Sequence, residues 1–339
     1  MAGPPRILFV FSGMGPQWPG MGRVLWERET VFRQTLEEID GRLQLLAGFS
    51  LIDAMMGPAN EDDADKGAEG GAAVAGAAWD CRVAQPAQLA LQVGLVRLLA
   101  SQGVEPDICL GHSAGEIASA YCSGHLSLDD ALAVCWARSD LQSARAGNGG
   151  LLAVMMDAAE ARAFCDRFPK LEVAAFNARR AISLAGLTKD LVEAERELRR
   201  TGVKVRRLEG DIGYHSVDMD PLLEPLRARL VGLTPLVPSV PLVSSVTARQ
   251  ITGQDPDVMD GPYWQKNVRL PVHFADALDT ALALGGTHFL EIGAKPVLQG
   301  AMRDKARERK RDIPILPTLE GEKDAQKAIE RVLSWIRRG

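Results

Sequence analysis

The sequence predicts an α/β fold made of two parts, a large subdomain with a parallel-sheet core and a small subdomain inserted into it. Three observations support this prediction. Short apolar runs alternate with helical runs near both ends of the chain, as in parallel sheets covered by helices. A strand, a tight turn and a helix follow one another around Ser113. Between Leu151 and Leu208 the order becomes β-α-β-β-α-β, which is that of a ferredoxin-like unit.

The first predicted strand, Ile7–Phe11, leads into the glycine-rich turn SGMGPQWPGMG and a helix near Val24. Residues Gly57–Ala78 are first acidic and then rich in Gly and Ala, which predicts a mobile surface loop. A helix is expected over Pro86–Gln102, because its leucines and valines have helical spacing. The segment DICLGHSAGEIASAY then predicts a buried strand, a tight turn at Ser113 and a further helix.

The next helix is predicted over Leu126–Ser143, since Ser127 can cap it and two acids follow in its first turn. The inserted unit is expected to contain strands Leu151–Met156, Leu171–Phe176, Ile182–Ala185 and Val203–Leu208, and helices Asp157–Arg167 and Thr188–Arg200. Beyond it we expect helices Pro221–Leu230, Phe274–Leu284 and Asp324–Arg337, and strands Pro241–Ser244 and His288–Ile292. The large subdomain is therefore predicted at 1–148 and 210–339, and the small subdomain at 149–209.

The composition is that of a globular protein, with 339 residues, of which 46% are apolar and 24% charged. The net charge of −5 provides no basic field to attract nucleic acid. The five cysteines are odd in number and show no CxxC or zinc spacing, so we expect a reduced, cytoplasmic protein without a metal site. The N-terminal apolar run is too short for a signal peptide or a membrane span.

The residue most suited to nucleophilic chemistry is Ser113, in Gly-His-Ser-Ala-Gly. A turn between a strand and a helix holds the hydroxyl clear of the backbone, and N–H groups at the helix start can stabilise an oxyanion. The alternative is an ordinary turn serine. His112 precedes Ser113 directly and is expected to point elsewhere if the serine occupies the turn.

A nucleophilic serine needs a base, and the chain has five histidines. His215, in DIGYHSVDMD, is the preferred candidate because it lies in a loop where the chain re-enters the large subdomain, and clefts form at such junctions. His273, which lies between apolar residues, is the weaker candidate. A hydrolase triad would also need a carboxylate. No nearby acid stands out among Asp211, Asp218, Asp220 and Glu291.

Arg138 lies in an otherwise apolar helical run that follows the serine turn. A planar guanidinium beside a cleft suits bidentate pairing with a ligand carboxylate. The alternative is a surface arginine, or a structural ion pair with Asp129, Asp130 or Asp140.

These motifs together resemble the malonyl/acyl-CoA:acyl-carrier-protein transacylase family, which includes the acyltransferase domains of polyketide synthases and animal fatty acid synthase. The resemblance covers nearly the whole chain through FVFSGMGPQWPGMG, AQPAQLAL, GHSAGE, ARS, GYHS, NVRLPVHF and FLEIGAKPVL. The GMGPQW form is closest to the polyketide and animal fatty acid synthase branches. The resemblance implies a hydrolase-like large subdomain.

The resemblance assigns roles to the candidate residues. Ser113 becomes the acylated nucleophile and His215 its base. The histidine is oriented by a backbone carbonyl, for which Asn267 is the matching position. The oxyanion hole consists of the N–H groups of Met14 and Ala114. The family often has Gln where this chain has Met14, a change that a main-chain donor tolerates.

The resemblance also implies how the acyl group is bound. Arg138 binds the free carboxylate of a malonyl-type group, and Gln17, Gln85 and His112 belong to the expected substrate-binding set. Tyr214, in GYHS, is bulky and should crowd a 2-methyl substituent, which favours malonyl over methylmalonyl. Two departures from the family pattern, Gly213 and Ala114, leave methylmalonyl or an unusual extender unit as an alternative.

The expected reaction is ping-pong transfer of a malonyl unit from CoA to the phosphopantetheine thiol of an acyl carrier protein. No permanently bound cofactor is expected, and a ketosynthase is a possible neighbour in a megasynthase. Two alternatives remain: an editing hydrolase of acyl thioesters, and a non-catalytic docking module for carrier proteins. A basic cluster is expected to be a solvated helix face or a carrier-protein contact: Arg303, Lys305, Arg307, Arg309, Lys310 and Arg311.

Overall fold

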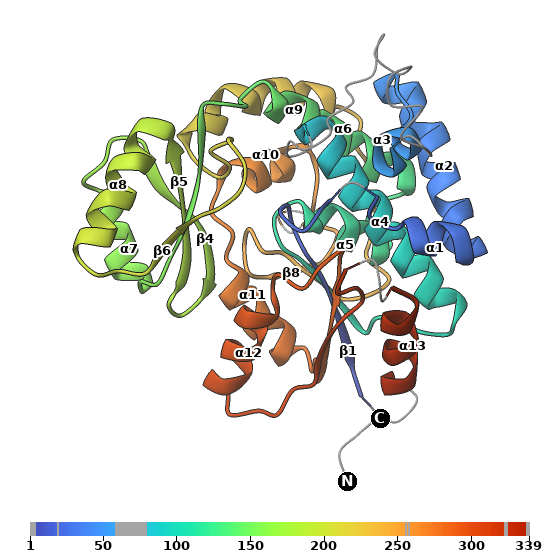
Figure 1. Ribbon diagram of the computed structural model, residues 1–339. Helices are drawn as coiled ribbons and strands as arrows, with labels where there is room; N and C mark the ends of the chain where they lie inside the picture. The colour runs from blue at the N-terminus through green and yellow to red at the C-terminus, as the bar shows by residue number, and fades with distance from the viewer. Residues whose placement is uncertain are drawn as a thin grey trace.

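The computed structural model describes residues 5–18, 20–57, 80–254, 256, 258–321 and 325–336. It confirms the predicted α/β class, with a mainly parallel sheet in the large subdomain and a separate antiparallel sheet in the small one (Figure 1). Apart from Gly57, the predicted loop over 57–78 lies outside the described residues.

The large sheet has six strands in the order β10-β9-β1-β2-β7-β8. Their bounds are Ile7–Phe11 for β1, Ile108–Gly111 for β2, Leu242–Val243 for β7, Gln250–Ile251 for β8, His288–Ile292 for β9 and Ile315–Pro317 for β10. All neighbours pair in parallel except β7 and β8. The central strand β1 is buried on both faces, which explains its unbroken apolar sequence.

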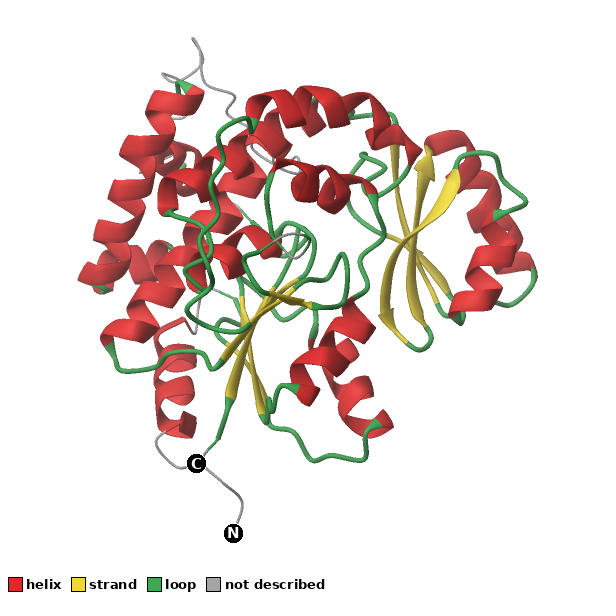
Figure 2. Cartoon of the chain, turned by 180° about the vertical axis from the view of Figure 1, so that it is seen from behind, coloured by secondary structure: helices red, strands yellow, loops and turns green. Residues whose placement is uncertain are grey.

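Helices cover both faces of this sheet (Figures 1 and 2). Alternate side chains of β1 point to opposite faces, so Phe9 and Phe11 join one core and Leu8 and Val10 join the other. The first core packs against α1 (Arg23–Arg28), α2 (Thr30–Ala47), α3 (Leu51–Met56), α4 (Cys81–Ser101), α5 (Gly115–Cys122), α6 (Leu128–Ser143), α9 (Leu223–Arg229), α10 (Gly261–Arg269) and α13 (Ala325–Ile336). The second packs against α11 (Phe274–Ala283) and α12 (Gln299–Glu308). Helices α2, α3 and α10 lie outside the predicted elements, and α12 contains the first part of the basic cluster that was expected to form a helix face.

Helix α4 starts earlier than predicted. It begins at Cys81 rather than Pro86, because the side chain of Asp80 caps it by accepting a hydrogen bond from the N–H of Arg82. Pro86 lies inside the helix, and the prediction started there because it rested on the spacing of the leucines and valines that follow this proline. By length and composition α4 could cross a membrane, but 78% of its most apolar window is buried inside the protein. It is the central core helix of the large subdomain.

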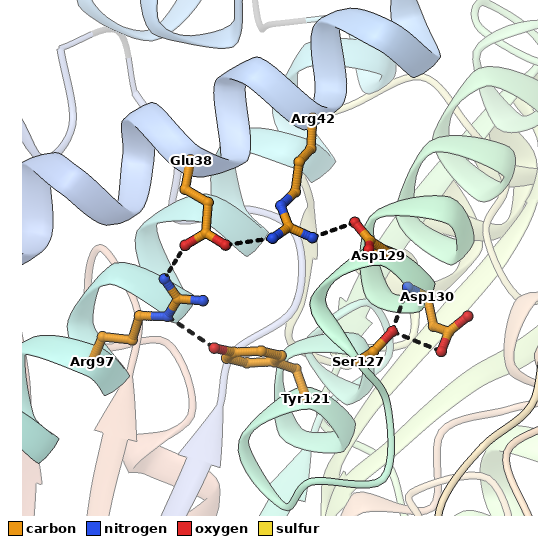
Figure 3. Close-up of polar contacts among 7 residues, drawn as sticks. All are labelled: Glu38, Arg42, Arg97, Tyr121, Ser127, Asp129 and Asp130. Carbon is orange, nitrogen blue, oxygen red and sulfur yellow. Dashed lines mark hydrogen bonds and ion pairs between the residues drawn. The ribbon is translucent and has the colours of Figure 1, made fainter.

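Polar side chains tie the outer helix α2 to its neighbours (Figure 3). Arg42 on α2 pairs with Glu38 and with Asp129 at the start of α6. Arg97 on α4 pairs with Glu38 and donates a hydrogen bond to the hydroxyl of Tyr121 on α5. These groups are partly exposed, so each pair contributes modestly to stability. Their main effect is to fix how the helices lie.

The small subdomain has the predicted β-α-β-β-α-β order. Its strands are β3 (Gly149–Val154), β4 (Leu171–Ala178), β5 (Ala181–Leu187) and β6 (Val205–Arg207), and its helices are α7 (Ala158–Cys165) and α8 (Thr188–Arg200). The antiparallel order β4-β5-β3-β6 is that of a ferredoxin-like sheet, and both helices share one apolar core with it. These elements lie within 149–209, and those subdomain boundaries remain a prediction.

The two subdomains meet along β4. The N–H of Phe176 donates to the carbonyl of Val272, and the N–H of Val272 donates to the carbonyl of Ala174, both at 2.8 Å. Arg269 also pairs with Glu172 across this junction. These contacts hold the small subdomain beside the segment after α10, which also contributes to the candidate site.

Candidate active site

Ser113 occupies the turn between β2 and α5 in a left-handed backbone conformation, with φ of 53°. The glycines on either side are required by close approach. A Cβ at Gly111 would lie 2.3 Å from the backbone N of Glu116, and one at Gly115 would lie 2.3 Å from the carbonyl O of Phe11. Strand and helix can therefore close tightly around the serine only with glycine at both positions.

The structure brings Ser113 and His215 together across 102 residues, with 2.7 Å between Oγ and Nε2. The other ring nitrogen of His215, Nδ1, lies 2.9 Å from the carbonyl O of Leu270. A carbonyl can only accept, so Nδ1 carries the proton and Nε2 is free to accept from the serine. This is the geometry of a nucleophile and its general base.

The prediction that the backbone carbonyl of Asn267 orients His215 is wrong, because the carbonyl of Leu270 makes this contact. Leu270 follows the last residue of α10 and has an extended backbone, so its carbonyl faces out of the helix. The candidate acids are engaged elsewhere. Two of them form ion pairs, Asp218 with Arg145 and Asp220 with Arg269. The other two accept hydrogen bonds from the backbone, Asp211 from the N–H of Gly147 and Glu291 from the N–H groups of Val297 and Leu298. No carboxylate in the described part of the chain contacts His215.

Asn267 instead lies beneath the serine turn. Its Nδ2 donates to the carbonyl of Ser113 at 3.2 Å and to Oε2 of Glu116 at 2.7 Å. Glu116 is fully buried and also accepts from the hydroxyl of Tyr263 and the N–H of Ser245. Burial raises the pKa of Glu116. This support of the serine turn by Asn267 and Glu116 was not predicted from the sequence, although Glu116 is part of the GHSAGE motif.

Arg138 is 1% exposed and faces the serine from α6. Its Nη2 donates to Oγ of Ser113 at 3.3 Å, and its Nη1 donates to Oε1 of Gln85. The alternative of a structural ion pair is not observed, because Asp129 pairs with Arg42, Asp140 pairs with Arg229, and Asp130 accepts from Ser127. Within the described residues, Arg138 forms no ion pair.

Two glutamines lie close to the turn and the arginine. Gln85 donates through Nε2 to Oε1 of Gln142 at 2.7 Å while it accepts from Arg138. Gln17 accepts from the N–H of Gly15 at 2.7 Å, so it shapes the glycine-rich turn after β1. The glutamines therefore support the arginine and the turn, respectively.

His112 points away from Ser113, as expected for its neighbour in the turn. Its Nε2 lies 2.8 Å from Oδ1 of Asn177 on β4, and its ring meets Phe274 edge-on. It thus links the serine turn to the small subdomain. Tyr214 donates to Sγ of Cys81 at 3.4 Å.

The predicted oxyanion hole is not tested by any bound group and remains a prediction. Ala114 lies at the start of α5, and the glycine-rich turn after β1 packs against the serine turn, since a Cβ at Gly13 would lie 2.7 Å from the carbonyl O of His112 and 3.5 Å from Cβ of Ser113. Among the described residues, no hydrogen bond engages the N–H of Met14 or of Ala114. Both donors are thus available near the serine.

The site is electropositive. Burial is the main cause that lowers the pKa of His215 to about 3, and the charge of Arg138 adds to it. Burial also lowers the pKa of Arg138, although a guanidinium stays protonated. His215 is therefore neutral at physiological pH, as a general base requires. No group of three or more His, Cys, Asp or Glu that could hold a metal ion occurs among the described residues.

Fold and site define an enzyme that transfers acyl groups. The family model of the acyl transferase domain matches residues 8–337, so the chain belongs to the acyl transferase domain family. Its relatives show that it is an acyltransferase domain of the polyketide synthase type. The predicted family resemblance is confirmed.

The relatives are large proteins. The chain is 36% identical over 308 residues to the reducing polyketide synthase AFT16-1 of Alternaria alternata, covering 88% of this chain and 12% of that protein. It is 35% identical over 294 residues to the pikromycin polyketide synthase component PikAIII of Streptomyces venezuelae, covering 86% of this chain and 18% of that protein. The chain thus spans less than a fifth of the length of these curated relatives.

Solved structures agree with this assignment. The acyltransferase domain from module 8 of the salinomycin polyketide synthase matches with a TM-score of 0.86 and 30% identity, over 98% of this chain and 75% of that chain. A loading acyltransferase from the avermectin modular polyketide synthase matches with a TM-score of 0.84 and 29% identity, over 96% of this chain and 99% of that chain.

Proposed function

We propose that this domain moves a malonyl-type acyl group from CoA to the phosphopantetheine thiol of an acyl carrier protein through an ester on Ser113. The observation that carries the proposal is Arg138, a buried guanidinium without an ion-pair partner in the described residues, 3.3 Å from the serine Oγ. An unpaired buried charge is costly, and a substrate carboxylate would offset that cost. The polyketide synthase relatives support the same reaction class.

In the first half-reaction, Ser113 attacks the thioester carbonyl while its proton passes to Nε2 of His215. The oxyanion accepts hydrogen bonds from the N–H groups of Met14 and Ala114. Collapse breaks the C–S bond, and His215 returns the proton to the leaving CoA sulfur. In the second half-reaction, the carrier thiol gives its proton to His215 and attacks the ester, so that the serine is regenerated.

The substrate carboxylate has a second effect in this mechanism. The positive charge of Arg138 contributes to the low pKa of His215. A bound carboxylate neutralises that charge, so the pKa of His215 rises towards its ordinary value and the histidine becomes a stronger base. Malonyl binding therefore activates the base, which acetyl binding cannot do.

The preference for malonyl over methylmalonyl rests on Tyr214, whose ring is predicted to crowd a 2-methyl group. Gly213, which departs from the usual alanine, has a structural reason here: a Cβ would lie 3.2 Å from the carbonyl O of Gly186 and from Oγ of Ser216. A Cβ there would be tightly placed, so the glycine suits the local packing, and the choice of extender unit is left to the test below. Methylmalonyl remains the alternative outcome of the test below.

The carrier protein is proposed to approach the basic cluster around α12. Three of its cations are already neutralised, since Lys305 and Arg309 pair with Asp279 and Arg307 pairs with Asp304. In the described part of the chain, the other three form no ion pair: Arg303, Lys310 and Arg311. Reversing charge at Lys310 and Arg311 should raise the KM for the carrier protein and spare acylation by malonyl-CoA.

The decisive experiment is intact-mass analysis of the domain after exposure to malonyl, methylmalonyl, ethylmalonyl or acetyl-CoA, with Ser113→Ala as control. We expect a malonyl adduct that Ser113→Ala abolishes and that a carrier protein removes by accepting the acyl group. Release to water that outruns transfer would establish the hydrolase alternative. Complete absence of an adduct would favour the docking module.

A further inference from the structure

We propose that Cys81 is a positioning residue that holds the ring of Tyr214 and thereby limits the substituent allowed on the carbon between the two carbonyl groups of a malonyl unit. The inference rests on the proposed function and deepens it, because it concerns which 2-substituted malonyl groups the site accepts. Its basis is the contact between a side chain at the start of α4 and one in the loop before His215.

The sulfur of Cys81 contacts two residues of the site, Tyr214 and Gln85. The hydroxyl of Tyr214 donates to Sγ at 3.4 Å. Nε2 of Gln85 lies 2.7 Å from the same sulfur, and the carbonyl oxygen of that amide accepts from Arg138. One atom therefore touches both the residue next to the general base and the residue that holds the guanidinium.

The two partners differ in how firmly the backbone holds them. Cys81 is 6% exposed and is the first residue of the buried helix α4, which Asp80 caps. Tyr214 lies in an irregular loop, directly before His215, whose φ is 59°. In the described residues, Sγ of Cys81 is the hydrogen-bond partner of the tyrosine hydroxyl. The fixed helix start thus sets the direction of the ring in the less regular loop.

The chemistry of the sulfur suits this place. Burial raises the pKa of the Cys81 thiol, so the group stays uncharged beside Arg138. A thiolate here would compete with the substrate carboxylate for the guanidinium. A neutral sulfur accepts the weak hydrogen bonds and leaves the charge of Arg138 to the ligand.

The geometry then defines the space for a 2-substituent. Arg138 is proposed to fix the far carboxylate, and Ser113 bonds to the carbonyl at the other end. The carbon between them is proposed to lie between these groups and beside the ring of Tyr214, the residue before His215. A ring held by Cys81 closes that interval, and a ring released from it can turn away and admit a methyl group.

The test is a competition between malonyl-CoA and methylmalonyl-CoA, read as the early ratio of the two Ser113 adducts by intact mass. Cys81→Ala and Tyr214→Phe each remove the hydrogen bond, and each should raise the methylmalonyl share about 3- to 10-fold, the worth of one such bond. The double variant should show nearly the same methylmalonyl share as either single variant, because both changes remove the same contact. Cys81→Ser keeps an acceptor and should stay nearer to the wild type.

Cys165→Ala, a buried cysteine in the small subdomain, is the matched control and should leave the ratio unchanged. The inference is overturned if the ratio does not respond to Cys81→Ala, or if the effects of Cys81→Ala and Tyr214→Phe add. Should Cys81→Ala fail to fold, an unchanged ratio in Tyr214→Phe overturns it equally. A wild-type domain without any Ser113 adduct refutes the proposed function itself, which separates the two failures.

Discussion

Replacing Arg138 by alanine tests the central feature of the site, a buried cation that we propose binds the substrate carboxylate. In the wild type a malonyl carboxylate can accept two charge-assisted hydrogen bonds from the guanidinium. Each is worth about 1.5–3 kcal/mol, so we expect kcat/KM for malonyl-CoA to fall by about 10²–10⁴ in Arg138→Ala. Acetyl-CoA leaves the guanidinium unpaired in the wild type, so its kcat/KM should hold or rise.

The measurement is the rate of Ser113 acylation with malonyl-CoA and with acetyl-CoA. Arg199→Ala is the matched control, because this arginine forms an exposed ion pair in the small subdomain. Arg138→Lys keeps the charge but loses the planar fork, and should show an intermediate preference. An unchanged malonyl-to-acetyl preference in Arg138→Ala would refute the role given to this residue.

Three further predictions concern the base, the serine turn and a helix cap. The value of kcat/KM for acylation by malonyl-CoA reports ionisation in the free enzyme, and it should stay flat between pH 8 and 5, because the pKa of His215 there is about 3 and the base loses activity only as pH falls through it; an acid limb of kcat/KM near the ordinary value of 6.5 would contradict this. Asn267→Ala should slow acylation about tenfold without changing its pH dependence, since Asn267 contacts the serine turn and not the histidine. A change in the pH dependence would show that Asn267 orients His215 after all. Ser127→Ala should cost about 1 kcal/mol in urea unfolding through loss of the α6 cap, with acylation unchanged.

The serine turn could be predicted from sequence because its requirements are local. Gly111 and Gly115 flank Ser113 within five residues, which makes the motif visible in the sequence; the steric reason for Gly111 lies in the helix that follows, whereas Gly115 lies against the end of β1. The candidate base was found by its position after the inserted unit. Arg138 stood out only once the family resemblance was combined with its place in an apolar helix.

The remaining contacts join segments far apart in the chain, and local patterns carry no information about them. Asn267 and Glu116 are 151 residues apart, and Tyr214 and Cys81 are 133 apart. The orienting carbonyl was placed at Asn267 instead of Leu270 because a motif match fixes a segment but not which carbonyl leaves the helix. The start of α4 was placed at Pro86 because the prediction rested on the spacing of the leucines and valines that follow, which does not detect the cap at Asp80.

The proposed role of Arg138 would link selectivity and turnover through the same arrangement of charges. Arg138 and His215 share a buried site in which no carboxylate of the described residues pairs with either, so the free enzyme carries a costly cation and a weak base. We propose that a malonyl carboxylate reduces both costs at once, because it would pair the cation and so remove the contribution of Arg138 to the low pKa of the histidine. An acyl group without a carboxylate does neither. Its acylation should therefore be slow even at saturating concentration, so that discrimination appears in kcat as well as in KM.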